Sequence, residues 1–300
     1  MKEKLQTLSR RYPILTVAVI IAALAGCILL LTREEEQTEA VVAEDAIVTD
    51  TLSLNLLLLP TMECLPLYHA LESGICDSLE LPLSIHDAGS QFDIDSIMRR
   101  TKRIDCAVFD AYRMEHYSKS KKRLPVTQLF PLQGRWKLIS SGSLRIREVD
   151  HLKKRILALD RFSTSAHEAE SALSSAKLTT EQLYLAQIND FGLRCDMLDE
   201  AQVDAVILPE PYASTALVRG HRCIWQKDSV SSLILCARDK VIKNKEKSEQ
   251  LKKLKQAYNL AVDDLNRHGR HVADSTLLKR YNLPQEVVDT LHLPKYKTSK

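Results

Sequence analysis

Residues 203–212 read VDAVILPEPY, an apolar run that follows a polar, helix-like stretch and ends in an acid, a proline and a tyrosine. Residues 104–112 read IDCAVFDAY and have the same plan. Short, nearly continuous apolar runs are typical of strands buried on both faces of a parallel sheet. The acid comes one residue later in the first stretch than in the second, so the two are a structural echo rather than a strict repeat. They predict two α/β lobes built on one local plan.

The flanking segments alternate between apolar runs and amphipathic stretches. An apolar run at 52–59 precedes a helix with Pro66 in its first turn and Gly74 just past its end, the usual start and stop signals. Ser165 and Glu168 form a predicted capping box that opens another helix. This alternation is typical of an α/β fold. We expect strands at 52–59, 79–85, 104–110, 126–132, 136–142, 155–160, 187–190, 203–211, 223–225 and 231–239.

Composition and motifs exclude several classes of function. The net charge is +3, from 42 basic and 39 acidic residues, so the charge does not indicate a nucleic-acid partner. Only 8 glycines are present, which disfavours Gly-rich phosphate loops. The sequence contains no G-x-S-x-G elbow, P-loop, G-x-G-x-x-G or H-E-x-x-H motif. Gly269 interrupts the one helix face on which His268 and His271 would meet Asp264. We therefore expect no enzymatic activity, no cofactor and no metal site.

The first 33 residues form a segment of their own. Four basic residues precede an apolar run at 14–31, and three glutamates at 34–36 follow it. Basic residues before the run favour a cytoplasmic N-terminus and an exported body. As a helix the run would span roughly 27 Å, close to the hydrocarbon core of about 30 Å. We expect an anchor or signal segment at 1–33 and an acidic tether at 34–50.

Residues 24–27, LAGC, leave the nature of this segment open. A small residue followed by cysteine is the form at which exported lipoprotein precursors are cut, with Cys27 as the lipidated residue. Cleavage there would place the apolar residues 28–31 next to the lipid, where a polar tether is usual. We favour an uncleaved transmembrane anchor over a lipoprotein, and either of these over cleavage after Ala25. The other six cysteines form no C-x-x-C motif, and we interpret them as buried free thiols.

Four stretches carry a resemblance to a known family. They are LLLLPTMECLPLYHALESGI, IMRRTKRIDCAVFD, LKKRILALDRFSTSAHEAESAL and LDEAQVDAVILPEPYASTALVRGH, and their order matters more than any one of them. From residue 52 to about 290 the chain resembles solute-binding proteins of the type II periplasmic-binding fold, in the branch that serves nitrate, sulfonate, taurine and thiamine-precursor importers. The family's enzymatic offshoot, a pyrimidine synthase, carries a cysteine-rich iron-binding motif that is absent here.

The resemblance implies two α/β lobes joined by a hinge, with the ligand between them. It implies lobe 1 at 51–132 plus 212–300 and lobe 2 at 133–211, behind the N-terminal anchor. Ligands in open α/β sheets bind beyond the carboxyl ends of strands, where helix N-termini offer free N–H groups. The candidate ligand-binding residues therefore follow strands: Thr61, Met62, Glu63, Ser90, Gln91, Asp110, Phe162, Ser163, Thr164, Asn189, Glu210 and Tyr212.

We expect an extracytoplasmic solute-binding protein that is anchored to the cytoplasmic membrane. It would capture a small molecule between its lobes and deliver it to an ABC permease in the same membrane, without a nucleic-acid partner. The alternative is a membrane-anchored sensor or structural protein that retains the binding fold without transport.

Overall fold

The computed structural model describes residues 50–118 and 123–299 of the chain. The predicted anchor at 1–33, Cys27 and nearly all of the predicted tether lie outside these residues. Within 50–118 and 123–299, no helix combines the length and the apolar character needed to cross a membrane.

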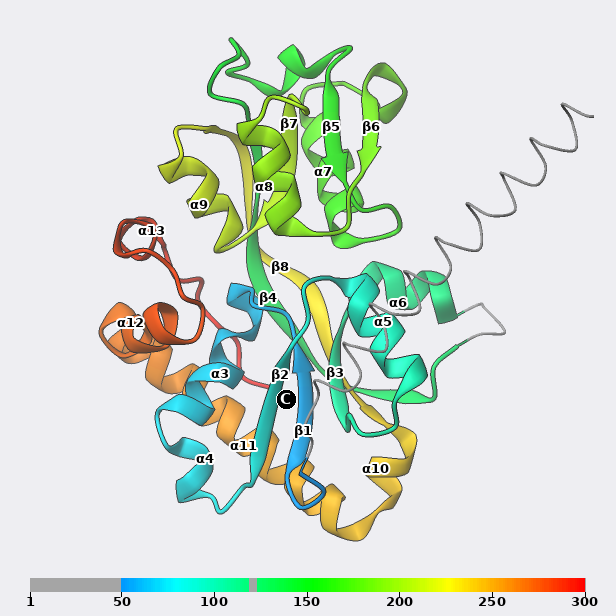
Figure 1. Ribbon diagram of the computed structural model, residues 1–300, viewed down its shortest axis with the longest axis vertical. Coiled ribbons are helices and arrows are strands. Elements are labelled where there is room, and N and C mark those ends of the chain that lie inside the picture. The colour runs from blue at the N-terminus through cyan, green and yellow to red at the C-terminus, as the bar shows by residue number, and fades with distance from the viewer. Residues whose placement is uncertain (1–49, 119–122, 300) are drawn as a thin grey trace, which may run out of the picture. The chain divides into compact units, whose positions relative to one another are not determined.

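The described chain is organised around one mixed sheet with the strand order β2-β1-β3-β8-β4-β7-β5-β6 (Figure 1). β1 pairs in parallel with β2 and β3, and β5 pairs in parallel with β6 and β7. The two parallel groups therefore lie at opposite ends of the sheet. The strands are β1 (Leu54–Leu58), β2 (Leu83–Asp87), β3 (Cys106–Asp110), β4 (Val126–Ser140), β5 (Ile156–Leu159), β6 (Tyr184–Gln187), β7 (Ala205–Pro209) and β8 (Arg222–Arg238).

Two long antiparallel strands, β4 and β8, join the parallel groups, and we call them the linking strands. The sequence predicted two strands in each of these places, at 126–132 and 136–142 and at 223–225 and 231–239, and that prediction is wrong. Each linking strand continues through the break in its apolar pattern because the β4–β8 ladder absorbs the irregularity as register shifts, two of them at Gly134. One continuous ribbon thus runs from one parallel group to the other.

Helices cover both parallel groups. We call the β1–β3 group with its helices lobe 1 and the β5–β7 group with its helices lobe 2. Lobe 1 contains α3 (Leu65–Glu72), α4 (Ile75–Ser78), α5 (Gln91–Arg100), α6 (Ala111–Ser118), α10 (Asp239–Lys243), α11 (Lys245–His268), α12 (Arg270–Lys279) and α13 (Gln285–Thr290). Lobe 2 contains α7 (Thr164–Ser175), α8 (Phe191–Asp199) and α9 (Tyr212–Val218). The short 3-10 turns are η1 (Met62–Cys64), η2 (Val149–Leu152) and η3 (Thr180–Gln182).

Local signals place several of these helices as expected. Pro66 lies in the first turn of α3, and Gly74 has a φ of 77° just past its end, a left-handed conformation that costs glycine little. The buried residues of α11 form an apolar stripe along one helix face, which packs against α3 and β1. The predicted capping box at Ser165 is wrong, because α7 begins two residues earlier and its N-cap is Ser163. Ser165 instead turns its hydroxyl back to the main chain of Asp160.

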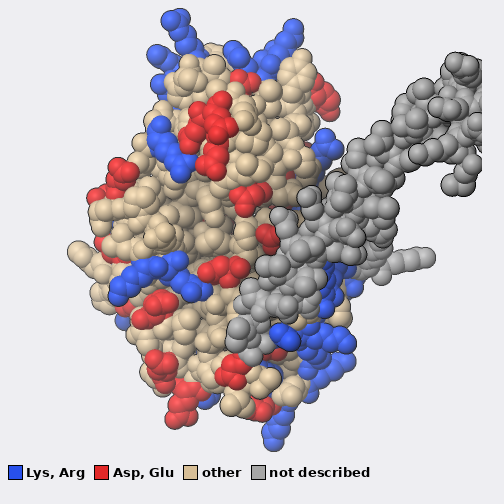
Figure 2. Space-filling view, viewed as in Figure 1, with Lys and Arg blue, Asp and Glu red and all other residues tan. Residues whose placement is uncertain are grey.

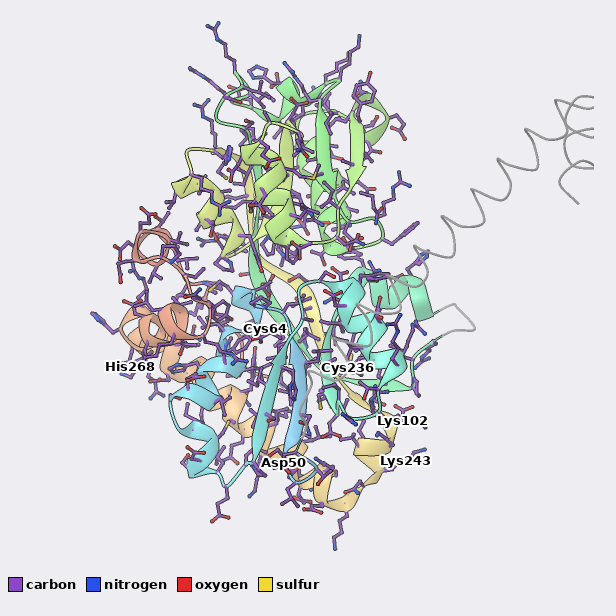
Figure 3. All side chains as sticks on the ribbon, viewed as in Figure 1. Asp50, Cys64, Lys102, Cys236, Lys243 and His268 are labelled. Carbon is purple, nitrogen blue, oxygen red and sulfur yellow. The ribbon has the colours of Figure 1, made fainter. Side chains whose placement is uncertain are left out.

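The six cysteines of the described residues are free thiols, and all but the half-buried Cys223 are buried. Burial raises the pKa of Cys195 and of Cys236 to about 12, so these thiols stay protonated. Figure 3 labels two of the cysteines, Cys64 at the end of η1 and Cys236 on β8 beside β3. These side chains act as small apolar groups, as the sequence indicated.

Arg238, at the end of β8, holds α5 and the loop that follows it to the sheet. Its side chain is 6% exposed and donates to the carbonyl oxygens of Ile104, Met98 and Thr101, each at 2.7 Å. The single amine of lysine cannot reproduce this forked geometry. We expect Arg238→Lys to lower the free energy of unfolding by about 2 kcal/mol. Urea denaturation measures the change, and exposed Arg222→Lys, at the other end of β8, is the control that should leave stability unchanged.

Charged side chains of both signs alternate over the face shown in Figure 2, with uncharged surface between them. This distribution matches the near balance of acids and bases in the sequence.

Candidate functional site

The loops that follow the strands of the two lobes meet beside the linking strands. The backbone N–H of Met62, after β1, donates to the carbonyl oxygen of Glu210, after β7, at 2.8 Å. The backbone N–H of Thr164, after β5, donates to Oδ2 of Asp110, at the end of β3, at 2.8 Å. The carboxyl ends of both parallel groups therefore face each other, which is where open α/β sheets bind ligands.

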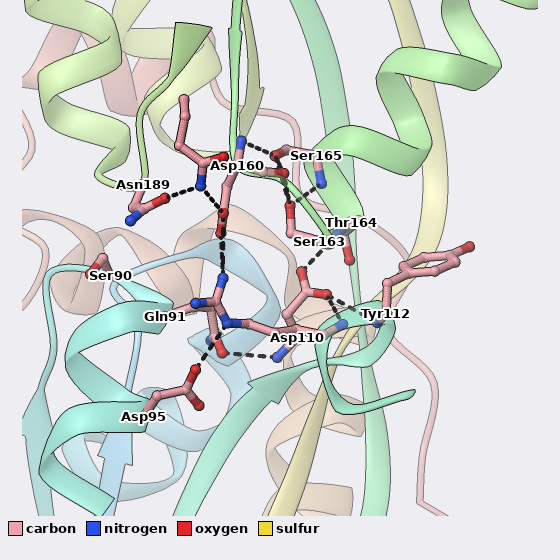
Figure 4. A network of polar contacts seen from close by, with 12 residues as sticks. Ser90, Gln91, Asp95, Asp110, Tyr112, Asp160, Ser163, Thr164, Ser165 and Asn189 are labelled. Atoms are coloured by element: carbon pink, nitrogen blue, oxygen red, sulfur yellow. Dashed lines mark hydrogen bonds and ion pairs between the residues drawn. The ribbon is translucent and has the colours of Figure 1, made fainter. Parts of the chain in front are cut away.

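Asp110 links the start of α6 in lobe 1 to the start of α7 in lobe 2 (Figure 4). Its Oδ1 accepts the backbone N–H groups of Tyr112 at 3.0 Å and Arg113 at 3.1 Å, while Oδ2 accepts that of Thr164. Gln91 fixes the Asp110 main chain by accepting its N–H at 2.9 Å. Burial raises the pKa of Asp110 to about 6, and the N–H group of Thr164 opposes this increase. One carboxylate thus caps two helices from opposite lobes.

Arg113 forms an ion-pair chain beside Asp110. Its Nε lies 2.9 Å from Asp95 Oδ2 on α5, and its terminal nitrogen lies 3.0 Å from Asp160 Oδ2 after β5. Burial raises the pKa of Asp95 and of Asp160, and Arg113 opposes the increase in both. Gln187 adds a hydrogen bond to Asp160 Oδ1 at 3.2 Å. The chain therefore crosses from lobe 1 to lobe 2 in a nearly dry environment.

Glu63 occupies the space between η1 and the linking strands. Its Oε1 accepts the indole N–H of Trp136 on β4 at 3.1 Å and the hydroxyl of Ser232 on β8 at 2.8 Å. The side chain is 1% exposed, and burial raises its pKa. Gly134 lies directly against it, since a Cβ on that glycine would come within 2.3 Å of Glu63 Cδ. Glu63 fits only because β4 has no side chain at this position.

Glu210 is fully buried after β7. Its Oε1 lies 2.5 Å from Lys137 Nζ on β4, and its Oε2 accepts the backbone N–H of Ser214 at 2.9 Å. Its carboxylate is therefore committed to lobe 2 and the linking strand, while its carbonyl oxygen binds lobe 1 through Met62.

Tyr212 lines a cavity of about 200 Å³ that has walls from both lobes. Its ring lies 5.4 Å from that of Phe191, and burial raises its pKa to about 12. The opposite wall includes Tyr281, whose hydroxyl donates to the carbonyl oxygen of Thr61 at 2.9 Å. The lining residues are Pro60, Gly192, Cys195, Asp196, Pro211, Tyr212, Thr215, Arg219, Tyr281 and Leu283.

Two other cavities, of about 450 and 300 Å³, lie beside α5 in lobe 1 and share Asp95 and Arg99 in their walls. Their linings contain no lobe 2 residue. Of these three cavities, the one lined by Tyr212 matches the expected position between the lobes.

We call the region where the strand-end loops of the two lobes meet the seam. The remaining candidate residues lie in the seam or at its edge. Ser90 caps α5, accepting the N–H of Asp93 at 3.2 Å, and Ser163 caps α7, accepting the N–H of Ser165 at 3.1 Å. Asn189 accepts from Gln187 at 3.0 Å. Phe162 is 61% exposed and stacks on His116 at the edge of the seam, 4.3 Å between ring centroids. Their roles as ligand contacts stay predictions.

Sequence reasoning did not select several residues that build this region. Trp136 and Ser232 hold Glu63 from the linking strands, and Arg113 pairs with Asp160 across the lobes. Tyr281 and Tyr296 bind the main chain of the loop after β1 from positions 220 and 234 residues further along the chain. No local pattern reports contacts at such separations.

Arg194 was also missed, and it is fully buried beneath the strand ends of lobe 2. Its guanidinium donates to the carbonyl oxygens of Ile188 and Ile207, both at 2.8 Å. Burial lowers its pKa to about 10. Arg194 lies within α8, whose polar and apolar residues form no clear face, so the sequence did not indicate that this arginine would be buried.

Comparisons with known proteins identify the fold. No protein-family model matches the sequence, and no curated protein matches it either. Among solved structures, the chain is similar to the alkanesulfonate-binding protein SsuA from Xanthomonas axonopodis pv. citri, with 12% identity, a TM-score of 0.65, and 83% of this chain and 88% of that one covered. It is similar to the periplasmic nitrate-binding protein NrtA from Synechocystis PCC 6803, with 12% identity, a TM-score of 0.67, and 84% and 74% covered.

The desulfurization enzyme DSZB is also similar, with 13% identity, a TM-score of 0.59, and 82% of this chain and 86% of that one covered. Most of these neighbours are binding proteins, and one enzyme shares their architecture. At these identities the similarity extends to the fold alone. The described chain therefore has the mixed α/β fold of the type II periplasmic binding proteins, as the resemblance in sequence implied.

Proposed function

We propose that this protein is an extracytoplasmic solute-binding protein that captures a small molecule between its lobes and delivers it to an ABC permease. The observation that carries the proposal is the cavity of about 200 Å³ with Pro60 and Tyr281 from lobe 1 and Tyr212 from lobe 2 in its walls. A ligand that contacts both lobes stabilises the closed arrangement by its differential affinity for it. The linking strands act as the hinge.

The proposal includes the finer expectations from the sequence. The segment 1–33 anchors the body to the cytoplasmic membrane, and the solute meets the strand-end residues already named. The first lobe boundary is the expected one at 132/133, within β4, whereas the second follows α9 instead of 211/212, because α9 packs on β7 and α8. The ABC permease is the expected partner because the neighbours named above include binding proteins for alkanesulfonate and nitrate.

Native mass spectrometry of the full-length chain, released from detergent, tests this function. We expect a co-purified solute that adds a defined mass to the protein. Tyr212→Ala removes one wall of the cavity and should reduce occupancy at least about tenfold, the equivalent of about 1.4 kcal/mol. Tyr184→Ala is the matched control, because Tyr184 is an exposed tyrosine of the same lobe that does not line the cavity. Equal occupancy in the two variants would place the solute elsewhere.

The alternative is a sensor or structural protein that keeps the fold without transport. The direct bonds across the seam, from Asp110 to Thr164 and from Arg113 to Asp160, favour it because they close the lobes without a ligand. Uptake by cells that lack the protein separates the two functions. Unchanged uptake of the solute found by mass spectrometry would favour the sensor.

A further inference from the structure

The helices that begin at the seam already carry acceptors from the chain itself. Asp110 accepts three N–H groups at the starts of α6 and α7. Asp190 accepts the N–H of Leu193 in the first turn of α8 at 2.7 Å, and Ser90 caps α5. Free N–H groups at helix N-termini are what a bound anion needs. At each of these helix starts, an acceptor of the chain itself thus takes at least one N–H group.

Several basic side chains around the seam are paired with acids as well. Arg113 binds Asp95 and Asp160, and Lys137 binds Glu210. Three further pairs are Lys227 with Glu168, Arg280 with Asp87, and Arg219 with Asp199, at 3.0, 3.1 and 2.7 Å. An anion that binds one of these side chains would have to break its existing pair.

The buried acid Asp110 is held by backbone N–H groups instead of a cationic side chain among the described residues. Its carboxylate thus sits in a nest of donors of the kind that binds an external anion. A second negative charge close to it would be repelled in a medium of low dielectric constant.

The lining of the interlobe cavity is neutral in sum. Its two charged residues, Asp196 and Arg219, lie 3.4 Å apart and compensate each other. Apart from the thiol of Cys195, the rest of the lining is aromatic, aliphatic or hydroxyl-bearing. The volume of about 200 Å³ has room for roughly seven water-sized groups. The cavity therefore fits a small molecule with an apolar body.

We propose that Asp110 takes the place of an anionic ligand where α6 and α7 begin, so that a solute bound at this part of the seam carries no net negative charge. The inference rests on the proposed function for its ligand, whereas the exclusion itself is a property of the seam. It predicts that the bound groups differ from the alkanesulfonate and nitrate named for the structural neighbours.

Thermal unfolding of the full-length chain with sodium sulfate and sodium methanesulfonate, against sodium chloride at equal ionic strength, tests the exclusion. Sulfate stabilises proteins non-specifically, so the comparison is between variants. The wild type should respond like Asp263→Ala, a control that removes one exposed acid of α11. Asp110→Ala frees three N–H groups. Sulfate should therefore raise the Tm of this variant by at least about 3 °C more than it raises the Tm of the wild type, because sulfate binds specifically to the freed groups.

Asp110→Ser opens the same space while keeping a small polar group, and it serves if Asp110→Ala does not fold. The proposal would be overturned if either anion raised the Tm of the wild type more than that of Asp263→Ala. It would also be overturned if the folded Asp110 variants showed no extra rise in Tm.

Failure of the proposed function is a separate result. A protein without any solute by mass spectrometry can still exclude anions, and a protein that carries an anion refutes the exclusion alone.

Discussion

Replacing Gly134 with alanine is expected to lower the free energy of unfolding by about 3 kcal/mol. The new Cβ would lie 2.3 Å from Cδ and 2.4 Å from Oε1 of Glu63. Glu63 cannot simply rotate away, because it is buried and bonded to Trp136 and Ser232. Moving its carboxyl group leaves a buried indole N–H and a buried hydroxyl without their acceptor, which is where most of the cost arises.

A double-mutant cycle isolates this contact. Urea denaturation, followed by tryptophan fluorescence, is measured for wild type, Gly134→Ala, Glu63→Ala and the double variant. Because Glu63→Ala removes the atoms that clash, we expect the second substitution to cost at least about 1 kcal/mol less in that background. Additive costs would show that Gly134 is required for some other reason than the space that Glu63 needs.

Replacing Arg113 with alanine is expected to lower the free energy of unfolding by about 3 to 5 kcal/mol at pH 7.5, because it removes the cation that pairs with two buried acids, Asp95 and Asp160. The matched control is Arg135→Ala, which breaks a pair with the exposed Asp228. An exposed pair contributes less than about 1 kcal/mol. Urea denaturation measures the free energy of unfolding of both variants. Equal losses would mean that the ion pairs of Arg113 between the lobes contribute no more to stability than an exposed pair.

The cost of Arg113→Ala should depend on pH in a defined direction. Burial already raises the pKa of Asp95 and of Asp160, and the loss of Arg113 raises both further. An acid whose folded pKa exceeds its unfolded pKa binds more protons in the folded state, so its contribution to stability falls as pH rises between the two values. The variant should therefore be closer to wild-type stability at pH 5 than at pH 7.5. A larger deficit at pH 5 would contradict this assignment.

The residues that hold the lobes together at the seam belong to no single sequence motif. Asp110 was a candidate because it ends a predicted strand, and the structure gives it partners in both lobes. Thr164 was a candidate for the same reason, and its backbone N–H contacts Asp110 while its hydroxyl donates to the carbonyl oxygen of Ser232 at 3.2 Å. The rule that strand ends converge was sufficient to select them. Whether a solute or another side chain fills the space between them depends on the opposing lobe.

The sequence by itself determined the alternation of strands and helices, since the apolar run of a strand and the Pro66 and Gly74 signals of a helix are local patterns. Only the tertiary structure decided that the runs on either side of Gly134 form one strand and that Glu63 fills the space beside it. It alone brought Tyr281 and Tyr296 to the loop after β1. These contacts join residues far apart in the chain, and they exist only once the linking strands have placed the lobes face to face. Hydrophobic periodicity reports which face of an element is buried, but not which distant side chain covers it.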